Sequence, residues 1–336
     1  MKKKLSKIIP FLLIAIVTIL VLYFSLKDEY EVIIDTILNI NKIWFLIAFL
    51  LLFGYYILKS YVTYRFAGDF NTKYSFKDAF RLTIETNFFH AITPFASGGQ
   101  PYEIYSLTKH KINIIDATNT SIECFIVYQI ALVFLGIVSI ISNQIFHVLN
   151  SRILNHLLTL GFLINFLVIV VLFWLTLSKK TEKNIIYKCI DLLGKIKLLP
   201  KAEEKKENVR KYLVKFNNGS KLLLKDKTRF FKMILFQLFS LICLYLVPLA
   251  LCYGTGHYNV NIFICILTMS YVMLIGSFVP IPGGTGGLEY GFIVFFGNFI
   301  SGGKLNAIML LWRFITYYFG MILGAIVLNI KGGNKK

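Results

Sequence analysis

The sequence predicts an all-α polytopic membrane protein with about six full spans and two broken, re-entrant helical hairpins that form an inverted repeat. Of its 336 residues, 57% are hydrophobic and 16% are charged, and the mean hydropathy is +0.68. An average soluble domain is about half apolar and a quarter charged. The apolar residues also occur in long blocks, two of which are interrupted by proline and glycine. These observations exclude an ordinary cytosolic enzyme and predict a single integral membrane domain over residues 1–336.

Seven apolar blocks are candidates to enter the hydrocarbon core, because a helix needs about 20 mostly apolar residues to cross it. The first block follows a run of lysines, and no small-residue cleavage site comes after it, so it is predicted to be an uncleaved anchor rather than a signal peptide. The blocks are Ile8–Leu26, Ile43–Tyr64, Ala117–Ser142, Leu157–Leu177, Phe230–Tyr253, Ile262–Val279 and Leu305–Ile330.

Positive charge indicates which ends of these blocks face the cytoplasm, because Lys and Arg are enriched on that side of a membrane. The formal net charge is +19, and the tract 178–228 alone holds 15 Lys and Arg against 6 Asp and Glu. We therefore place this tract, residues 65–81 and 109–111, and both termini in the cytoplasm. The acidic loop 27–42 and the nearly uncharged stretch 254–261 are expected outside. The predicted location is the cytoplasmic membrane.

Two segments, Phe76–Leu107 and Ile262–Ile300, are apolar but contain proline and glycine near their middle. The charge assignments agree only if the first segment enters from the cytoplasm and returns to it. Three crossings then separate it from the second segment, which must enter from the opposite side. Interrupted backbone at membrane depth is tolerated only where protein or a wet cavity satisfies its polar groups. The two segments therefore predict re-entrant hairpins of opposite orientation.

The two interruptions share the pattern P-x3-G-x4-E, which runs from Pro94 to Glu103 and again from Pro280 to Glu289. Proline ends a helix because it lacks an amide donor, and glycine lets a head group approach bare backbone. The helix that begins after each break has amide N–H groups that can hold a phosphate. Secondary transporters build their sites from opposed repeats with broken helices. The pattern therefore predicts a lipid-binding and translocation site.

Charged residues at membrane depth are functional candidates, since an uncompensated charge is costly there. Glu103 and Glu289 each lie in the first turn after a break, where they can meet a cationic head group or merely cap their own helix. Arg313 is expected to pair with Glu289 or Glu103, either within the site or as an ion pair that only locks the bundle. Glu85 and Glu123 are second-rank candidates, with Glu123 close enough to the cytoplasmic interface to stay hydrated. The predicted site residues are Pro94, Gly98, Gly99, Glu103, Pro280, Pro282, Gly283, Gly284, Gly286, Gly287, Glu289 and Arg313.

Other polar or small residues in the spans are predicted to have structural roles. Lys59 and Arg81 are expected to extend to the membrane surface, and His90 is expected to pack. Gly320 and Gly324, four residues apart in the last span, favour close helix packing. The sequence contains no constellation typical of a catalytic triad, a metal site or a nucleotide-binding loop, so we predict no catalytic residues, metal or cofactor.

At the two motifs the sequence resembles the lysylphosphatidylglycerol synthase transmembrane region, the flippase-like half of the multiple peptide resistance factor. The strongest similarity lies in residues 280–289, residues 93–103 and the basic middle loop, and the resemblance covers nearly the whole chain. In that family the membrane region is associated with moving aminoacylated phosphatidylglycerol across the bilayer, which repels cationic antimicrobial peptides. The resemblance implies a free-standing flippase for phosphatidylglycerol, its lysyl form or a related phospholipid, which contributes to resistance against such peptides.

Two other functions remain open from the sequence. In the family, a separate soluble domain transfers lysine from lysyl-tRNA to phosphatidylglycerol, so one alternative is a phosphatidylglycerol lysyltransferase that also binds tRNA. The longest segment outside the predicted spans, residues 178–228, is too short for such a domain, and we expect no transferase activity from this chain by itself. The other alternative is a membrane scaffold that recruits a separate synthase through this basic tract. The tract also suits attraction of anionic lipid.

Overall fold

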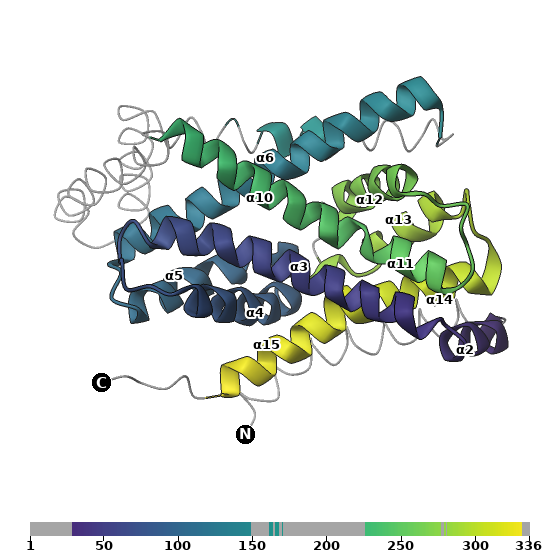
Figure 1. The fold of residues 1–336 in the computed structure, drawn as a ribbon, viewed down its shortest axis with the longest axis horizontal. Helices are drawn as coiled ribbons and strands as arrows, with labels where there is room; N and C mark the ends of the chain where they lie inside the picture. The colour runs from purple at the N-terminus through teal and green to yellow at the C-terminus, as the bar shows by residue number, and fades with distance from the viewer. Residues whose placement is uncertain are drawn as a thin grey trace, which may run out of the picture.

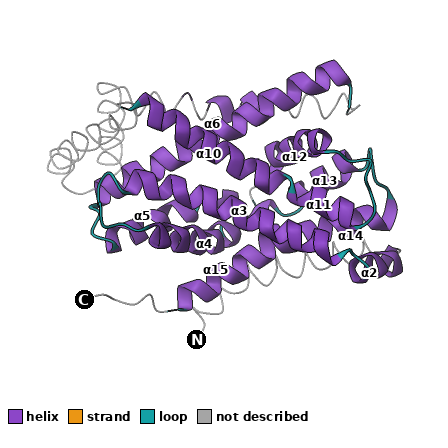
Figure 2. Cartoon of the chain, in the orientation of Figure 1, coloured by secondary structure: helices purple, strands orange, loops and turns teal. Residues whose placement is uncertain are grey.

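The computed structural model describes residues 29–148, 161–163, 165–167, 170, 226–276, 279 and 281–330. The predicted anchor 8–26, most of the block 157–177, the basic tract up to residue 225 and Pro280 lie outside the described residues. Within the described part, every regular element is a helix (Figure 1, Figure 2). This confirms the all-α prediction.

Four stretches of helix are long and apolar enough to cross a membrane in the described part of the chain. They are α3 (Lys42–Ala67), α6 (Ile114–Phe146), the pair α10 (Lys227–Tyr245) and α11 (Val247–Gly254), and the run α14 (Gly302–Arg313), η4 (Phe314–Phe319) and α15 (Gly320–Asn329). α10 gives way to α11 beside Pro248, which has no amide hydrogen to continue the helical bonding. The protein is therefore a polytopic membrane protein, as predicted.

The first broken segment is a hairpin whose two ends lie at the same end of the bundle. It consists of α4 (Phe76–Ile92), the single 3-10 turn η2 (Pro94–Ala96) and α5 (Gly99–Lys109). Ser75 and Asp78 form a reciprocal capping box that starts α4. Asn71 precedes the hairpin and His110 follows it. Asn71 Nδ2 donates a 2.7 Å hydrogen bond to the carbonyl of His110. This bond ties the entry of the hairpin to its exit.

The second broken segment is a hairpin that opens at the opposite end. It consists of α12 (Ile262–Gly276), the 3-10 turn η3 (Pro282–Gly284) and α13 (Gly287–Phe296). Asn259 Nδ2 donates a 2.8 Å hydrogen bond to the carbonyl of Phe299, which joins entry and exit. α3 begins and α11 ends at this same end, where the Asn41 amide donates to the Gly254 carbonyl. The turns η2 and η3 contact each other, and the two hairpins lie toward opposite ends of the bundle (Figure 1). The inverted arrangement is the predicted one.

A short helix, α2 (Tyr30–Leu38), occupies the segment that was expected to be an outer loop. It packs against the start of α14, where Asn306 Nδ2 donates a 2.6 Å hydrogen bond to the Glu29 carboxylate. Gly303 makes room for this contact, because a Cβ there would lie 2.9 Å from Val32. Acidic and apolar residues recur at helical spacing in this segment, which indicates a helix. The prediction of a loop considered only the charges.

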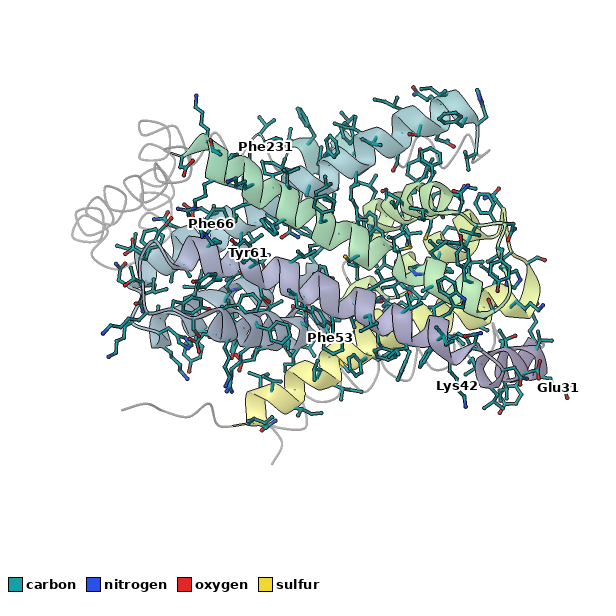
Figure 3. All side chains as sticks on the ribbon, in the orientation of Figure 1. Glu31, Lys42, Phe53, Tyr61, Phe66 and Phe231 are labelled. Carbon is teal, nitrogen blue, oxygen red and sulfur yellow. The ribbon has the colours of Figure 1, made fainter. Side chains whose placement is uncertain are left out.

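The helices enclose an apolar core and also present apolar residues outward. Phe292 stacks on the buried Trp312 with 4.9 Å between ring centroids. Phe231, on the outer face of α10, is 61% exposed. The charged residues Glu31 and Lys42 lie at one end of the molecule (Figure 3). Large exposed apolar surfaces are rare on soluble monomers, so this distribution fits a belt of lipid around the bundle.

The last span crosses α4 at close range because Gly324 has no side chain. A Cβ at Gly324 would lie 2.7 Å from the carbonyl oxygen of Ile84 and 3.0 Å from the amide nitrogen of Phe88. A Cβ at Gly320 would lie 2.6 Å from the hydroxyl of Tyr56 on α3. The predicted close packing at this glycine pair is confirmed, and Gly324 joins the last span to the first hairpin.

We expect Gly324→Leu to separate α15 from α4 and to lower the free energy of unfolding by roughly 1–3 kcal/mol. Backbone atoms of α4 cannot rotate aside to admit the new side chain. Thermal unfolding of the purified protein in detergent measures the loss. Ala325→Leu is the matched control, because Ala325 follows Gly324 in the sequence but lines an open groove that can admit a larger side chain. Equal losses in both variants would show that the close crossing at Gly324 does not matter for stability.

Candidate functional site

The second break is shaped by glycines with left-handed backbone and is closed by Glu289. Gly283, Gly284 and Gly286 have φ values of +67°, +62° and +87°, which residues with a Cβ rarely adopt. Glu289 Oε2 accepts a 2.7 Å hydrogen bond from the amide of Gly286. One carboxylate oxygen of Glu289 therefore caps its own helix, which is one of the two roles the sequence left open.

The other oxygen of Glu289 belongs to a buried ion pair with Arg313. Arg313 Nε lies 2.7 Å from Glu289 Oε1, and only 4% of the arginine side chain is exposed. Arg313 Nη2 also donates a 3.0 Å hydrogen bond to the carbonyl of Gly283 and a longer one, 3.4 Å, to Thr285 Oγ1. The last span thus holds the second break through one guanidinium. Of the two carboxylates expected as partners, Arg313 pairs with Glu289.

Tyr317 connects the two breaks and was not found from the sequence. Its ring lies against Gly283, where a Cβ would approach the ring to 2.1 Å. Its hydroxyl donates a 3.1 Å hydrogen bond to the carbonyl of Ala91, at the end of α4. The Arg313 guanidinium lies 4.5 Å from the centroid of the same ring, a cation–π contact. The spacing of Tyr317 one turn after Arg313 was the available signal.

The first break is stabilised mainly by its own polar groups. Thr93 Oγ1 accepts a 2.8 Å hydrogen bond from the amide of Gly98. Phe95 and Ala96 have φ values of +53° and +51°, although neither is glycine. His90 Nδ1 is hydrogen-bonded to the carbonyl of Ala96, so His90 packs as predicted. The strain of two left-handed residues at this turn is sustained by these bonds, and such strain is frequent at functional sites.

Gly98 and Gly99 are required at the start of α5 by close contacts rather than by their φ values. A Cβ at Gly98 would lie 2.6 Å from Thr93, and one at Gly99 would lie 2.0 Å from the imidazole of His90. In the second break, a Cβ at Gly287 would lie 2.1 Å from Val279. Pro94 and Pro282 begin η2 and η3. Pro280 is outside the described residues.

Glu103 follows the first break but does not repeat the contacts of Glu289. Its Oε2 accepts a 2.8 Å hydrogen bond from the hydroxyl of Ser121 on α6. Lys59 on α3 lies within electrostatic range of the carboxylate. In the described part of the chain, no hydrogen bond or ion pair joins Glu103 to Arg313 or to Glu289. The two motif glutamates are thus held by separate partners in the two halves.

Glu85 joins the two helices of the first hairpin, and its partner Arg81 binds the last span. Arg81 Nε lies 2.7 Å from Glu85 Oε1, and Tyr102 donates a 2.7 Å hydrogen bond to Glu85 Oε2. Arg81 Nη2 donates to the carbonyls of Val327 and Ile330 at the end of α15, over 3.0 and 2.5 Å. As predicted, Arg81 extends toward the surface, where 31% of its side chain is exposed. Unpaired carbonyls at a helix end attract a cation, and they hold Arg81 in place.

Glu123 is buried on α6, and the expectation that it stays hydrated is wrong. It is 2% exposed, and neither carboxylate oxygen has a hydrogen-bond partner among the described residues. The charges within electrostatic range are Asp69 and Arg229, which already bind each other through Arg229 Nη1 and Asp69 Oδ1 at 2.6 Å. Glu123 lies about two turns into α6, near enough to its end for hydration to be expected. Side chains of α3 and α10 pack around this part of α6 and bury the carboxylate.

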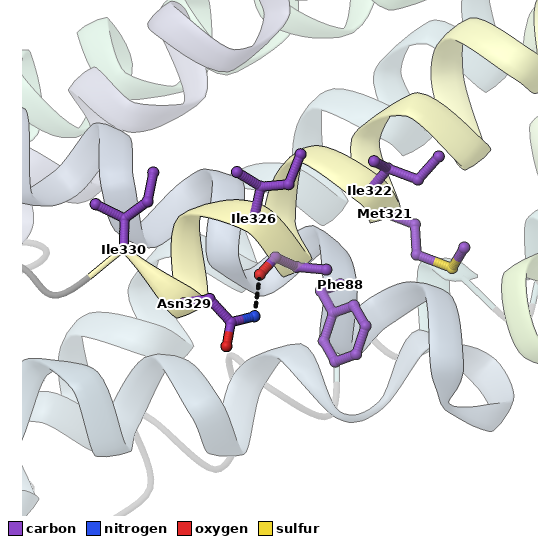
Figure 4. Close-up of a pocket in the computed structure, with 7 residues that line it drawn as sticks. Phe88, Met321, Ile322, Ile326, Asn329 and Ile330 are labelled. Carbon is purple, nitrogen blue, oxygen red and sulfur yellow. Dashed lines mark hydrogen bonds between the residues drawn. The ribbon is translucent and has the colours of Figure 1, made fainter.

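An apolar groove runs along α15, with Phe88 of α4 in its wall (Figure 4). Its walls are formed by Phe88, Met321, Ile322, Ala325, Ile326, Asn329 and Ile330. Asn329 Nδ2 donates to the carbonyl of Ala325 within its own helix, over 2.8 Å. The groove contains none of the charged site residues. The groove is an apolar surface along the last span.

Comparison with known proteins agrees with this architecture. A family model described as the lysylphosphatidylglycerol synthase TM region matches residues 8–324. A UPF0104 membrane protein from Archaeoglobus fulgidus is 22% identical over 319 residues, which cover 90% of this chain and 90% of that relative. The family match includes both broken hairpins and nearly all of the last span. The chain belongs to the family of lysylphosphatidylglycerol synthase transmembrane regions.

Proposed function

We propose that this protein translocates a phospholipid across the cytoplasmic membrane, with phosphatidylglycerol or its lysyl form as the substrate. The single observation that carries the proposal is the pair of breaks that enter from opposite ends and contact each other at η2 and η3. Secondary transporters place substrate sites where such broken helices meet. Interrupted backbone of this kind is otherwise costly at membrane depth.

The second break supplies the groups that would bind a lipid phosphate. Arg313 is buried, and its guanidinium carries donors in a planar fork that matches phosphate oxygens. The amide N–H groups at the start of α13 point from the same loop and add favourable dipoles. An arriving phosphate would compete with Glu289 for Arg313. Release of the Glu289 carboxylate would then let it meet a cationic group on the lipid head.

Alternating access follows from the arrangement of the two hairpins. In this proposal one break would be reached from each side of the membrane, and Tyr317 connects the two breaks through its hydrogen bond to the Ala91 carbonyl. Exchange of the Arg313–Glu289 ion pair for contacts with a head group would loosen η3 from the last span. Movement of one half against the other would then pass the head group between the breaks while the acyl chains stay in lipid.

The proposal also assigns partners and a physiological effect. A separate synthase would supply the aminoacylated lipid, and the basic tract 178–228 is available to recruit it. Export of a lipid with added positive charge would make the outer surface less anionic and reduce binding of cationic antimicrobial peptides. Both assignments depend on the identity of the transported lipid.

A flippase measurement on the full chain tests the function. The protein is reconstituted in phosphatidylcholine vesicles with a trace of phosphatidylglycerol that bears a fluorescent acyl chain, and a membrane-impermeant quencher reports movement between leaflets. We expect Glu289→Gln to lower the rate by about tenfold or more, because the charge that exchanges with the substrate is lost. Glu103→Gln is expected to do the same from the first half.

Asp35→Asn is the matched control, since Asp35 is a carboxylate of α2 that lies far from both breaks in the sequence. It should leave the rate unchanged. Wild-type rates in both Glu103→Gln and Glu289→Gln would remove these carboxylates from the function and with them the proposal.

A further inference from the structure

Lys59 lies within α3, and its side chain does not extend to the membrane surface as the sequence predicted. It lies about two turns before the cytoplasmic end of α3. Its Nζ donates a 3.4 Å hydrogen bond to the hydroxyl of Tyr55, one turn further from that end. A lysine that extends to the surface would point the other way. The ammonium group is therefore directed into the bundle, and the prediction of a surface position is wrong.

The neighbours of the ammonium group belong to the first break. Glu103 on α5 and His90 on α4 both lie within electrostatic range of Lys59. The His90 ring in turn covers Gly99, the first residue of α5, where a Cβ would lie 2.0 Å from the ring. The cation, the carboxylate and the amino end of α5 thus gather on one side of α3.

Lys59 is not neutralised by direct contact with Glu103. The Glu103 carboxylate accepts its hydrogen bond from Ser121, and the structure shows no direct ion pair between these two described residues, Lys59 and Glu103. In the second half, by contrast, Arg313 and Glu289 are in contact at 2.7 Å. The first half therefore holds a separated cation and anion, whereas the second half holds a closed pair.

We propose that Lys59 binds the phosphate of the transported lipid at the first break, as the counterpart of Arg313 at the second break. The inference rests on the proposed function and adds a residue and a role to it. A part-buried ammonium group without a contacting anion is destabilising, and a phosphate oxygen offsets that cost through charge-assisted hydrogen bonds. The amide groups at the start of α5 favour the same anion. Glu103, kept apart by Ser121, remains available to a cationic part of the head group.

The test compares two fluorescent lipids in the same reconstituted system. Vesicles of phosphatidylcholine carry a trace of acyl-labelled phosphatidylglycerol or of acyl-labelled phosphatidylcholine, and the full-length protein moves the label between leaflets. We expect Lys59→Gln to lower the rate for phosphatidylglycerol by about tenfold and to remove the preference for it over phosphatidylcholine. Lys59→Arg, which keeps the charge, should retain both rate and preference.

Lys42→Gln is the matched control, because Lys42 is exposed at the opposite end of the same helix. It should behave as the unmodified protein. A wild-type rate and preference in Lys59→Gln, while Glu289→Gln is inactive, would overturn this inference and leave the proposed function intact. Equal loss for both lipids, with a lowered unfolding temperature and no rescue by Lys59→Arg, would assign Lys59 a purely structural role. Full activity of Glu103→Gln and Glu289→Gln would instead overturn the proposed function.

Discussion

Arg313→Gln is expected to abolish lipid movement and to destabilise the protein by roughly 3–5 kcal/mol, the typical cost of removing one partner from a buried ion pair. The variant leaves Glu289 facing a site with no cation in contact. It also removes the hydrogen bond to the Gly283 carbonyl, so η3 loses its tie to the last span. Thermal unfolding in detergent measures the first effect, and the vesicle assay with labelled phosphatidylglycerol measures the second.

Two further variants separate the contribution to stability from the contribution to transport. In Glu289→Leu/Arg313→Met both charges are replaced by apolar groups, which often restores or improves stability relative to the broken pair. We expect this double variant to recover most of the lost stability and none of the transport. Lys304→Gln, at the exposed start of the same helix, should change neither quantity. Transport by the double variant would show that the ion pair only locks the bundle.

The sequence predicted the architecture because the membrane imposes strong constraints on composition. Long apolar blocks, the distribution of Lys and Arg and the two Pro- and Gly-rich interruptions were enough to predict opposed hairpins. The pairing of Arg313 was also predictable, since a guanidinium in a span needs a carboxylate and few were available. Each of these inferences depends on the chemistry of a single residue or block at membrane depth. None requires knowledge of which helices pack against one another.

The missed residues are those whose role depends on sideways packing. Ser121 and Tyr317 are ordinary residues in apolar helices, and only the position of α6 beside α5 and of η4 beside α4 makes them partners of the breaks. The surface position expected for Lys59 failed for the same reason. A side chain near a helix end extends toward water only if no polar group of a neighbouring helix binds it first. Lys59 binds the hydroxyl of Tyr55, whereas Arg81 binds carbonyls at the end of α15 and stays 31% exposed.

Gly283→Ala is expected to have the second large effect, because two separate costs act at this position. The residue has φ of +67°, and a Cβ would lie 2.1 Å from the ring of Tyr317. Gly286 has φ of +87° but no atom within 4 Å of a Cβ. Gly286→Ala therefore measures the backbone cost alone, about 1–2 kcal/mol, and Gly283→Ala should cost roughly 1–3 kcal/mol more for the displaced ring.

The difference between these two glycines tests whether the contact between the breaks matters for function. Displacement of the Tyr317 ring would pull its hydroxyl from the Ala91 carbonyl and uncouple η3 from the first hairpin. We therefore expect Gly283→Ala to move phosphatidylglycerol at least about tenfold more slowly than Gly286→Ala. Tyr317→Phe removes the hydroxyl without moving the ring and should slow transport while stability changes little. Equal losses of stability and transport in Gly283→Ala and Gly286→Ala would show that backbone strain alone explains both variants. The hydrogen bond of Tyr317 to the Ala91 carbonyl would then have no role in transport.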